Sequence, residues 1–146
     1  MSPSTEARPI GGVHHAAFRC RDAEQTIWFY QDVLGLVADG ALVLDEGTGT
    51  GKQDPYMQIF LRMKNGEYIA FFDAPGSADP DWFARKESFD MHFAFEVGSE
   101  ADLLAMQERI NAHGISALGP VDHGMVKSIN MYDPNGIQIE LTVRTA

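Results

Sequence analysis

Glu140 is the side chain in this sequence whose surroundings most clearly call for a chemical partner. Ile139 and Leu141 flank it, so an extended segment here carries apolar side chains on one face and the carboxylate on the other. Burial of an unpaired charge costs several kcal/mol or forces the group to become neutral. A group that can pair with Glu140 is therefore expected elsewhere in the chain.

Two histidines, His15 and His92, stand at equivalent places in an internal repeat and are candidate partners for Glu140. They are 77 residues apart, and the polar residues that begin the helix expected after each of them, Asp22 and Ser99, are also 77 apart. Two imidazoles and one carboxylate that converge on a cavity can bind a divalent metal such as Fe(II), with positions left open for substrate and O2. The sequence therefore predicts a metal site formed by these three residues.

A strand followed by a helix opens each copy of the repeat and positions its histidine. Segments 13–20 and 91–97 alternate in polarity as half-buried strands do. The helices that follow are expected to end at Gly35 and Gly114, because glycine readily adopts the left-handed conformation found at helix C-termini. By strand alternation His14 is expected to point to the face opposite His15, and it is interpreted as structural or as a residue that contacts a metal ligand.

Three further strands complete each copy. Both copies contain an Asn-Gly turn, at 65–66 and at 135–136, and this dipeptide strongly favours a hairpin. The turns are 70 residues apart, so the second copy is shorter, and loop 45–55 has little counterpart in it. The expected strands are 41–44, 56–63 and 67–73 in the first copy, and 115–118, 125–132 and 137–143 in the second, with a loop between 118 and 125.

The repeat predicts an α+β fold in which two paired βαβββ modules form a metal-binding cleft. Each module alone is too small to bury both faces of its sheet, so the two are expected to pair and to enclose a shared cleft. The expected organisation is a flexible N-terminal tail at 1–9, a first module at 10–74, a connector at 75–89 and a second module at 90–146, which together form one domain.

Charge and composition exclude several classes of partner. Lys and Arg number 11 against 21 Asp and Glu, a net charge of −10, which argues against nucleic acid and against anionic membranes as partners. Cys20 is the single cysteine, so no internal disulfide can form. The sequence shows no signal peptide and no apolar stretch long enough to span a membrane, so a cytoplasmic protein is expected.

Four groups of residues, taken together, carry a family resemblance. They are Val13-His14-His15-Ala16-Ala17-Phe18, Phe29-Tyr30 with Leu34-Gly35-Leu36, Met91-His92-Phe93-Ala94-Phe95, and Asp133-Pro134-Asn135-Gly136 with Ile139-Glu140-Leu141. Over residues 11–143 the chain resembles the vicinal oxygen chelate superfamily, which includes glyoxalase I, extradiol ring-cleaving dioxygenases, epimerases and drug-resistance proteins. The resemblance implies paired βαβββ modules around a metal, subunits assembled as homodimers, and His15, His92 and Glu140 as the ligands.

Ala70 occupies the first-copy position that corresponds to Glu140. The resemblance implies that glyoxalase-like and epimerase-like members carry a fourth ligand there, usually Glu or Gln, which in glyoxalase-type chemistry also helps to move the proton. Alanine can do neither, so the three-ligand set resembles the dioxygenase branch. Tyr68 and Phe72 share the face of Ala70 and are expected to bind a planar aromatic substrate.

A partial extradiol-like signature precedes Glu140. Such signatures resemble His, several residues, an apolar residue, Tyr, two residues, a small polar residue and Pro, and here His123 is the histidine while Asn130 replaces the tyrosine. The resemblance implies that His123 assists proton transfer or binds the reacting oxygen, and that Asn130 or Tyr132 hydrogen-bonds the substrate. The base histidine that extradiol enzymes usually carry before the second ligand has no counterpart in 74–91.

Three hypotheses about function follow. The leading one is an Fe(II)-dependent dioxygenase that uses O2 to cleave or oxygenate a small aromatic diol-like substrate. The alternative is a glyoxalase- or epimerase-type lyase or isomerase that uses Mn, Ni, Co or Zn, which needs a base that Ala70 does not supply. The third is a binding protein of the bleomycin-resistance kind, although such proteins generally lack the metal triad.

Overall fold

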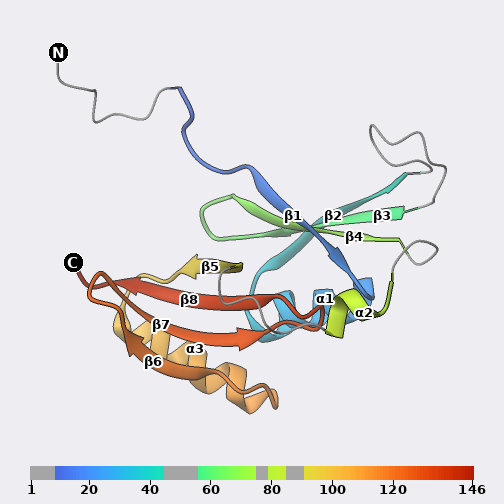
Figure 1. The fold of residues 1–146 in the computed structure, drawn as a ribbon. Helices are drawn as coiled ribbons and strands as arrows, with labels where there is room; N and C mark the ends of the chain where they lie inside the picture. Colours follow the sequence, from blue (N-terminus) through green and yellow to red (C-terminus); the bar gives the residue numbers. More distant parts are fainter. Residues whose placement is uncertain (1–8, 45–55, 75–78, 85–90) are drawn as a thin grey trace.

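The computed structural model describes residues 9–44, 56–74, 79–84 and 91–146, which form two four-stranded sheets (Figure 1). The first sheet has the strand order β1-β4-β3-β2 and the second β5-β8-β7-β6, so one topology occurs twice. This confirms the α+β fold with two βαβββ modules. The strands are β1 (His15–Cys20), β2 (Val37–Leu44), β3 (Tyr56–Arg62), β4 (Tyr68–Asp73), β5 (His92–Glu96), β6 (Leu118–Asp122), β7 (Val126–Tyr132) and β8 (Gln138–Arg144).

A helix follows the first strand of each module. The crossover that it makes places β1 parallel to β4 and β5 parallel to β8, whereas all other neighbouring strands are antiparallel. The helices are α1 (Ala23–Ile27), which continues into the π-helix η1 (Trp28–Val33), and α3 (Glu100–Ala112).

The helix ends that the sequence predicts are confirmed. The side chains of Asp22 and Ser99 each accept a hydrogen bond from a backbone N–H of the first helical turn. Gly35 and Gly114 follow the helices with φ angles of 87° and 81°, a conformation in which glycine alone is unstrained. These local signals fix where each helix begins and ends.

Part of the first helix is π-helical, which its periodicity did not predict. The backbone N–H of Leu34 bonds to the carbonyl oxygen of Phe29, five residues earlier, at 3.0 Å. Phe29, Tyr30 and Val33 all point into the core, each with 0% of its surface exposed. The wider turn thus lets three large side chains of one short segment reach the same core.

Two strands differ from the prediction. β2 begins at residue 37 instead of 41. Its register with β3 shifts between Ala38 and Ala41, where Gly40 has a φ of 112° that glycine tolerates. The strand thus continues through this irregularity. β6 covers 118–122 instead of 115–118, although it contains Pro120. β6 is an edge strand, where a missing backbone N–H costs the sheet nothing.

Several expectations fall on residues outside the described ranges. The loop 45–55 lies outside them, as do residues 1–8 of the expected tail and much of the connector 75–89. Within the connector, residues 79–84 are described and contain the short helix α2 (Asp81–Ala84). Among the helices that the structure describes, none is both long enough and apolar enough to cross a membrane.

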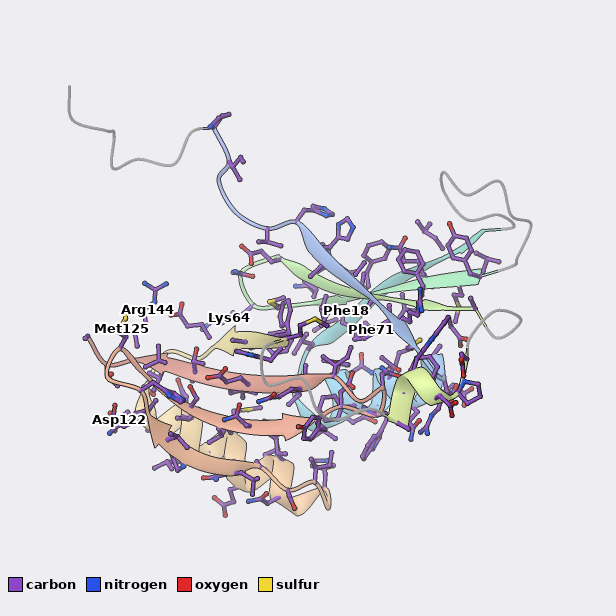
Figure 2. All side chains as sticks on the ribbon, viewed as in Figure 1. Phe18, Lys64, Phe71, Asp122, Met125 and Arg144 are labelled. Atoms are coloured by element: carbon purple, nitrogen blue, oxygen red, sulfur yellow. The ribbon has the colours of Figure 1, made fainter. Side chains whose placement is uncertain are left out.

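The two modules share one hydrophobic core. Figure 2 shows Phe18 and Phe71 pointing from the first sheet towards the second, and the ring centroid of Phe18 lies 6.0 Å from that of Phe93 on β5. Side chains alternate along a strand, so His15 and His92 lie on the opposite faces of these two strands. The faces that meet within the chain are therefore not the faces that carry the predicted metal ligands.

A buried polar network joins the first helix to the turn between β7 and β8. The Tyr30 hydroxyl donates to Asp133 Oδ2 at 2.7 Å, Asn135 Nδ2 donates to Thr26 Oγ1 at 3.2 Å, and Asn135 Oδ1 accepts from the Arg21 N–H at 2.8 Å. Burial, with the nearby Asp133 carboxylate, raises the pKa of Tyr30 well above its usual range, so the hydroxyl stays a neutral donor. Burial also raises the pKa of Asp133, and the bonds that it accepts oppose this rise.

Replacement of Tyr30 should destabilise the fold through this network. Tyr30→Phe should lower the free energy of unfolding by about 1–3 kcal/mol, because the buried Asp133 loses a donor that water cannot replace. Equilibrium unfolding in urea measures the change. The matched control is Tyr68→Phe, which removes an exposed hydrogen bond to Asp39 and should change the free energy of unfolding by less than about 0.5 kcal/mol. Equal losses in the two variants would contradict the role of the network.

Candidate metal centre

His92 and Glu140 lie side by side on the second sheet. His92 Nε2 is 2.9 Å from Glu140 Oε2, and the two residues come from the neighbouring parallel strands β5 and β8. Glu140 is 9% exposed, so its carboxylate is almost removed from water, whereas 37% of the His92 side chain is exposed. The partner that the buried carboxylate requires is thus an imidazole in the same module.

His15 does not join this pair within the chain. Its ring centroid lies 5.9 Å from that of Phe60 on the first sheet. In the ranges that the structure describes, no three His, Cys, Asp or Glu side chains are grouped so that they could hold a metal ion. Within one chain His15 therefore does not lie with His92 and Glu140, because the modules meet through their aromatic faces, and the three-residue metal site stays a prediction.

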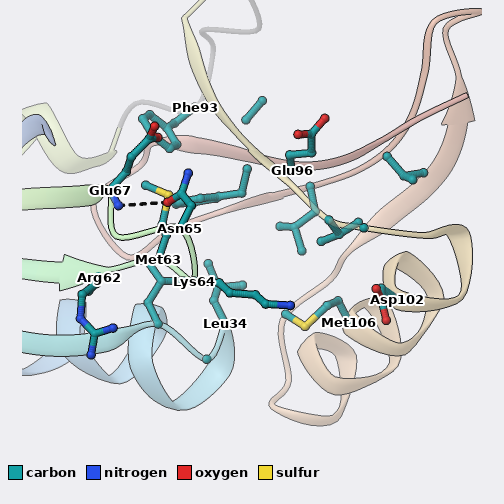
Figure 3. Close-up of a pocket in the computed structure, with 18 of the residues that line it drawn as sticks. Leu34, Arg62, Met63, Lys64, Asn65, Glu67, Phe93, Glu96, Asp102 and Met106 are labelled. Atoms are coloured by element: carbon teal, nitrogen blue, oxygen red, sulfur yellow. Dashed lines mark hydrogen bonds between the residues drawn. The ribbon is translucent and has the colours of Figure 1, made fainter. Parts of the chain in front are cut away.

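A groove does lie between the modules, but other residues line it. It has a volume of about 1470 Å³, and Figure 3 shows the β3–β4 turn with Lys64 and Asn65 opposite Phe93 and the helix residue Met106. Phe93 belongs to the β5 face opposite His92. The groove is therefore separate from the predicted metal ligands.

Strand register confirms that Ala70 is the structural counterpart of Glu140. Ala70 pairs with Ala17, two positions after His15, and Glu140 pairs with Ala94, two positions after His92. Ala70 is completely buried. The first module therefore offers one imidazole and no carboxylate where the second offers both.

The first-sheet face that carries His15 is aromatic. Tyr68 and Phe72 lie on this face with Ala70, as the sequence predicts, and the Tyr68 hydroxyl donates to Asp39 Oδ2 at 3.1 Å. Phe60 pairs with Ala70 and also contacts the ring of Tyr68, with centroids 5.8 Å apart. Phe60 was not assigned a role from the sequence, although the alternation of 56–63 relative to Ala70 could have indicated it.

The second-sheet face that carries Glu140 is polar. Asn130 pairs with Glu140 and Tyr132 with Gln138, so both predicted polar residues lie on the face of the carboxylate. Gln138 Nε2 donates to Asn130 Oδ1 at 3.2 Å, and no hydrogen-bond partner for Gln138 Oε1 lies among the described residues, although that atom is buried. Alternation puts Gln138 on this face, yet no role was assigned to it from the sequence.

His123 lies in the turn between β6 and β7, away from Glu140. Its backbone N–H bonds to the carbonyl oxygen of Val126 at 2.8 Å, whereas Glu140 pairs with Asn130, four residues further along β7. Four residues of strand span about 13 Å. Figure 2 shows Met125 of this turn at the end of the second sheet. His123 therefore lies near the turn end of the hairpin and not beside Glu140. The structure does not support its predicted role next to Glu140.

Residues 12–141 match the family model described as the Glyoxalase/Bleomycin resistance protein/Dioxygenase superfamily. The chain belongs to this superfamily. The paired βαβββ modules described above agree with that assignment, as does the resemblance that the motifs carry.

Individual proteins of the superfamily are similar to this chain. A lactoylglutathione lyase of Pseudomonas aeruginosa is 24% identical over 152 residues, which cover 88% of this chain and 80% of that protein. The glyoxylase/bleomycin resistance protein/dioxygenase domain of Frankia sp. EAN1pec has a TM-score of 0.72 at 20% identity and covers 92% of this chain and 93% of its own. A mutant of the fosfomycin resistance protein FosX of Listeria monocytogenes, solved with Mn(II) and a dihydroxypropylphosphonic acid, has a TM-score of 0.61 at 22% identity. The match covers 90% of this chain and 91% of the FosX chain.

The His92–Glu140 pair fits a divalent metal, which superfamily members commonly bind. Bonds from such metals to imidazole nitrogen and to carboxylate oxygen are about 2.1 Å long, so two ligands at a right angle are about 3.0 Å apart. His92 Nε2 and Glu140 Oε2 are 2.9 Å apart. This is the length of an N–H···O hydrogen bond, and it is also compatible with two ligands of one metal.

Loss of the Glu140 carboxylate should weaken metal binding strongly. Loss of groups that only orient a ligand costs about 10–100-fold in affinity, so Glu140→Gln should weaken Mn(II) binding by more than about 100-fold, as measured by isothermal titration calorimetry. Glu96→Gln is the matched control, because Glu96 lies on the same face of β5 as His92 but pairs with Arg144 instead of a metal-site residue. An unchanged affinity in Glu140→Gln would remove Glu140 from the metal site.

Proposed function

We propose that this chain is a divalent-metal-dependent enzyme that works as a homodimer. Each metal would be held by His92 and Glu140 of one subunit and by His15 of the partner subunit. The observation that carries the proposal is the separation of His15 from a His92–Glu140 pair that is otherwise arranged for a metal. The superfamily consists mostly of enzymes, which supports a catalytic role for such a site.

A second copy of the chain is the natural source of the third ligand. In one chain the aromatic faces of the two sheets meet. The face that carries His15 and the face that carries Glu140 therefore do not contact each other within that chain. In a two-fold symmetric dimer, any contact between the His15 face of one subunit and the Glu140 face of the other occurs twice. Two equal metal sites would then form.

Ala70 supports a centre with three protein ligands. Three ligands leave about half of an octahedral shell open, enough for two adjacent oxygens of a substrate and one further small molecule. Phe60, Tyr68 and Phe72 would give the cavity one aromatic wall, while Asn130 and the other polar residues on the Glu140 face would give it a hydrogen-bonding wall. This combination suits a flat ring that carries neighbouring oxygen atoms.

Fe(II)-dependent oxygenation of an aromatic diol-like substrate is the reaction that these walls favour. When bound, the metal would supply a charge that makes the diol more acidic and a place where O2 reacts. Phe60 and Phe72 would hold the ring flat, and Asn130, Gln138 and Tyr132 would hydrogen-bond its polar substituents. Gln138 Oε1 suits this role because the atom is buried and accepts no hydrogen bond within the described residues. His123 has no part in this proposal.

A lyase or isomerase reaction with Mn, Ni, Co or Zn is the second candidate. It is favoured by the similarity to a lactoylglutathione lyase and to the FosX variant solved with Mn(II). Such proton-transfer chemistry requires a base near the substrate. Ala70 supplies none, so this candidate requires the base to come from a residue that the sequence pattern does not indicate.

Complementation between variants tests whether the site is shared. Neither His15→Ala nor His92→Ala should bind Mn(II) when expressed alone. Co-expression of the two should restore about one quarter of the wild-type sites, because half of the dimers are mixed and each of these has one intact site. Calorimetric titration gives the stoichiometry. If no sites return, the metal is not shared between subunits, and if His15→Ala binds like the wild type, His15 is not a ligand.

Oxygen uptake distinguishes the two reactions. Protein purified anaerobically and loaded with Fe(II) should consume O2 in an oxygen-electrode assay with catechol or hydroxyquinone substrates, and His92→Ala should not. Absence of uptake, together with proton exchange on a thiohemiacetal by the Mn, Ni, Co or Zn form, would favour the second candidate. A wild-type protein that binds none of these metals would overturn both reactions.

A further inference from the structure

His14 and His15 form a direct contact between their imidazole rings. The two Nδ1 atoms are 2.8 Å apart, and the ring centroids are 5.1 Å apart with an interplanar angle of 84°. A neutral imidazole has one N–H and one bare nitrogen, so one of the two Nδ1 atoms donates and the other accepts. The direction of this hydrogen bond decides what His15 Nε2 can do.

Only one direction is compatible with metal binding by His15. If His15 Nδ1 donates, its Nε2 has a lone pair and can bind a metal; if His14 Nδ1 donates, His15 Nε2 carries the hydrogen and cannot. Histidines that bind metals generally donate the other ring N–H to a neighbouring acceptor, which fixes both the tautomer and the ring orientation. Here the nitrogen in contact with His15 Nδ1 is Nδ1 of His14, which can accept this bond when it is bare.

The His14 ring is itself held in place by the first sheet. The backbone N–H of Tyr68 donates to the carbonyl oxygen of His14 at 2.9 Å, and the ring centroids of His14 and Tyr68 lie 5.5 Å apart. Tyr68 is anchored in turn by its hydroxyl, which donates to Asp39, and Asp39 pairs with Arg62 at 3.0 Å. A continuous series of contacts therefore leads from Arg62 to His15.

In the second module the position that corresponds to His14 is Met91. Met91 precedes His92, and its thioether sulfur is only a weak hydrogen-bond acceptor. His92 instead has Glu140 at 2.9 Å, a fixed contact within its own module. In the first module, where Ala70 replaces that glutamate, His14 is the polar side chain that contacts the ring of His15.

We propose that His14 is a positioning residue for the metal ligand His15, which it holds in the tautomer that has Nδ1 protonated and Nε2 bare. This inference depends on the proposed function, in which His15 binds the metal.

Two substitutions at His14 separate its hydrogen bond from its bulk. Asparagine has an oxygen close to the place of Nδ1 and can accept the same bond, whereas leucine fills a similar volume without an acceptor. His14→Leu should weaken Mn(II) binding by about 10–100-fold, and His14→Asn should stay within about threefold of the wild type. Calorimetric titration of the full-length dimer measures both affinities.

Heteronuclear NMR of the imidazole nitrogens gives a second readout that needs no metal. At a pH where both rings are neutral, the metal-free wild type should show His15 with Nδ1 protonated, and His14→Leu should shift His15 towards the tautomer with Nε2 protonated. His14→Asn should restore the wild-type signals. A merely structural role of His14 would not produce this pattern.

The outcomes separate this inference from the function on which it depends. If the wild type binds Mn(II) while both His14 variants bind equally well and show the wild-type tautomer, the role of His14 is overturned and the metal site stands. If the wild type binds no Mn(II), or if His15→Ala binds like the wild type, the proposed function fails. The tautomer of His15 in the metal-free protein then still decides whether His14 orients it.

Discussion

The buried hydrogen bond from Tyr30 to Asp133 constrains how the two modules face each other. It ties the helix of the first module to the β7–β8 turn of the second, where each of its groups is shielded from water. A sliding or rotation of one module would leave a buried carboxylate without its donor, at a cost of about 1–3 kcal/mol. Together with the shared hydrophobic core, this bond keeps the aromatic faces together and the two faces with predicted metal ligands apart.

This constraint gives the Asp133-Pro134-Asn135-Gly136 motif a structural meaning. In the sequence the motif resembles part of an extradiol-type signature that also includes His123. In the fold Asp133 and Asn135 close the turn and bond to Tyr30 and Thr26 of the first helix, while His123 lies at the far end of β7. A motif can thus be typical of a superfamily because it docks two modules, and it then says little about the reaction.

The fold could be predicted from the sequence further than the site could. Helix caps, glycine stops and strand alternation are local signals, and two copies of one pattern reinforced each other, so most elements were placed correctly. The π-helical turn and the strand through Pro120 depend on packing and on sheet position, which periodicity does not contain. The separation of His15 from His92 depends on which faces of two modules meet. That choice rests on contacts between residues far apart in the sequence, such as the Phe18–Phe93 ring contact and the Tyr30–Asp133 hydrogen bond.

The difference between the modules explains how one chain can bury Glu140 before any metal or partner binds. His92 contacts the carboxylate within the same sheet, so the second module does not depend on the metal to accommodate this charge. The first module has Ala70 at the equivalent place and needs no such contact. His15 contacts His14 instead, and the face that carries His15 can remain aromatic. A duplicated scaffold thereby provides two unlike walls, one polar and one aromatic, and neither half requires the complete site in order to fold.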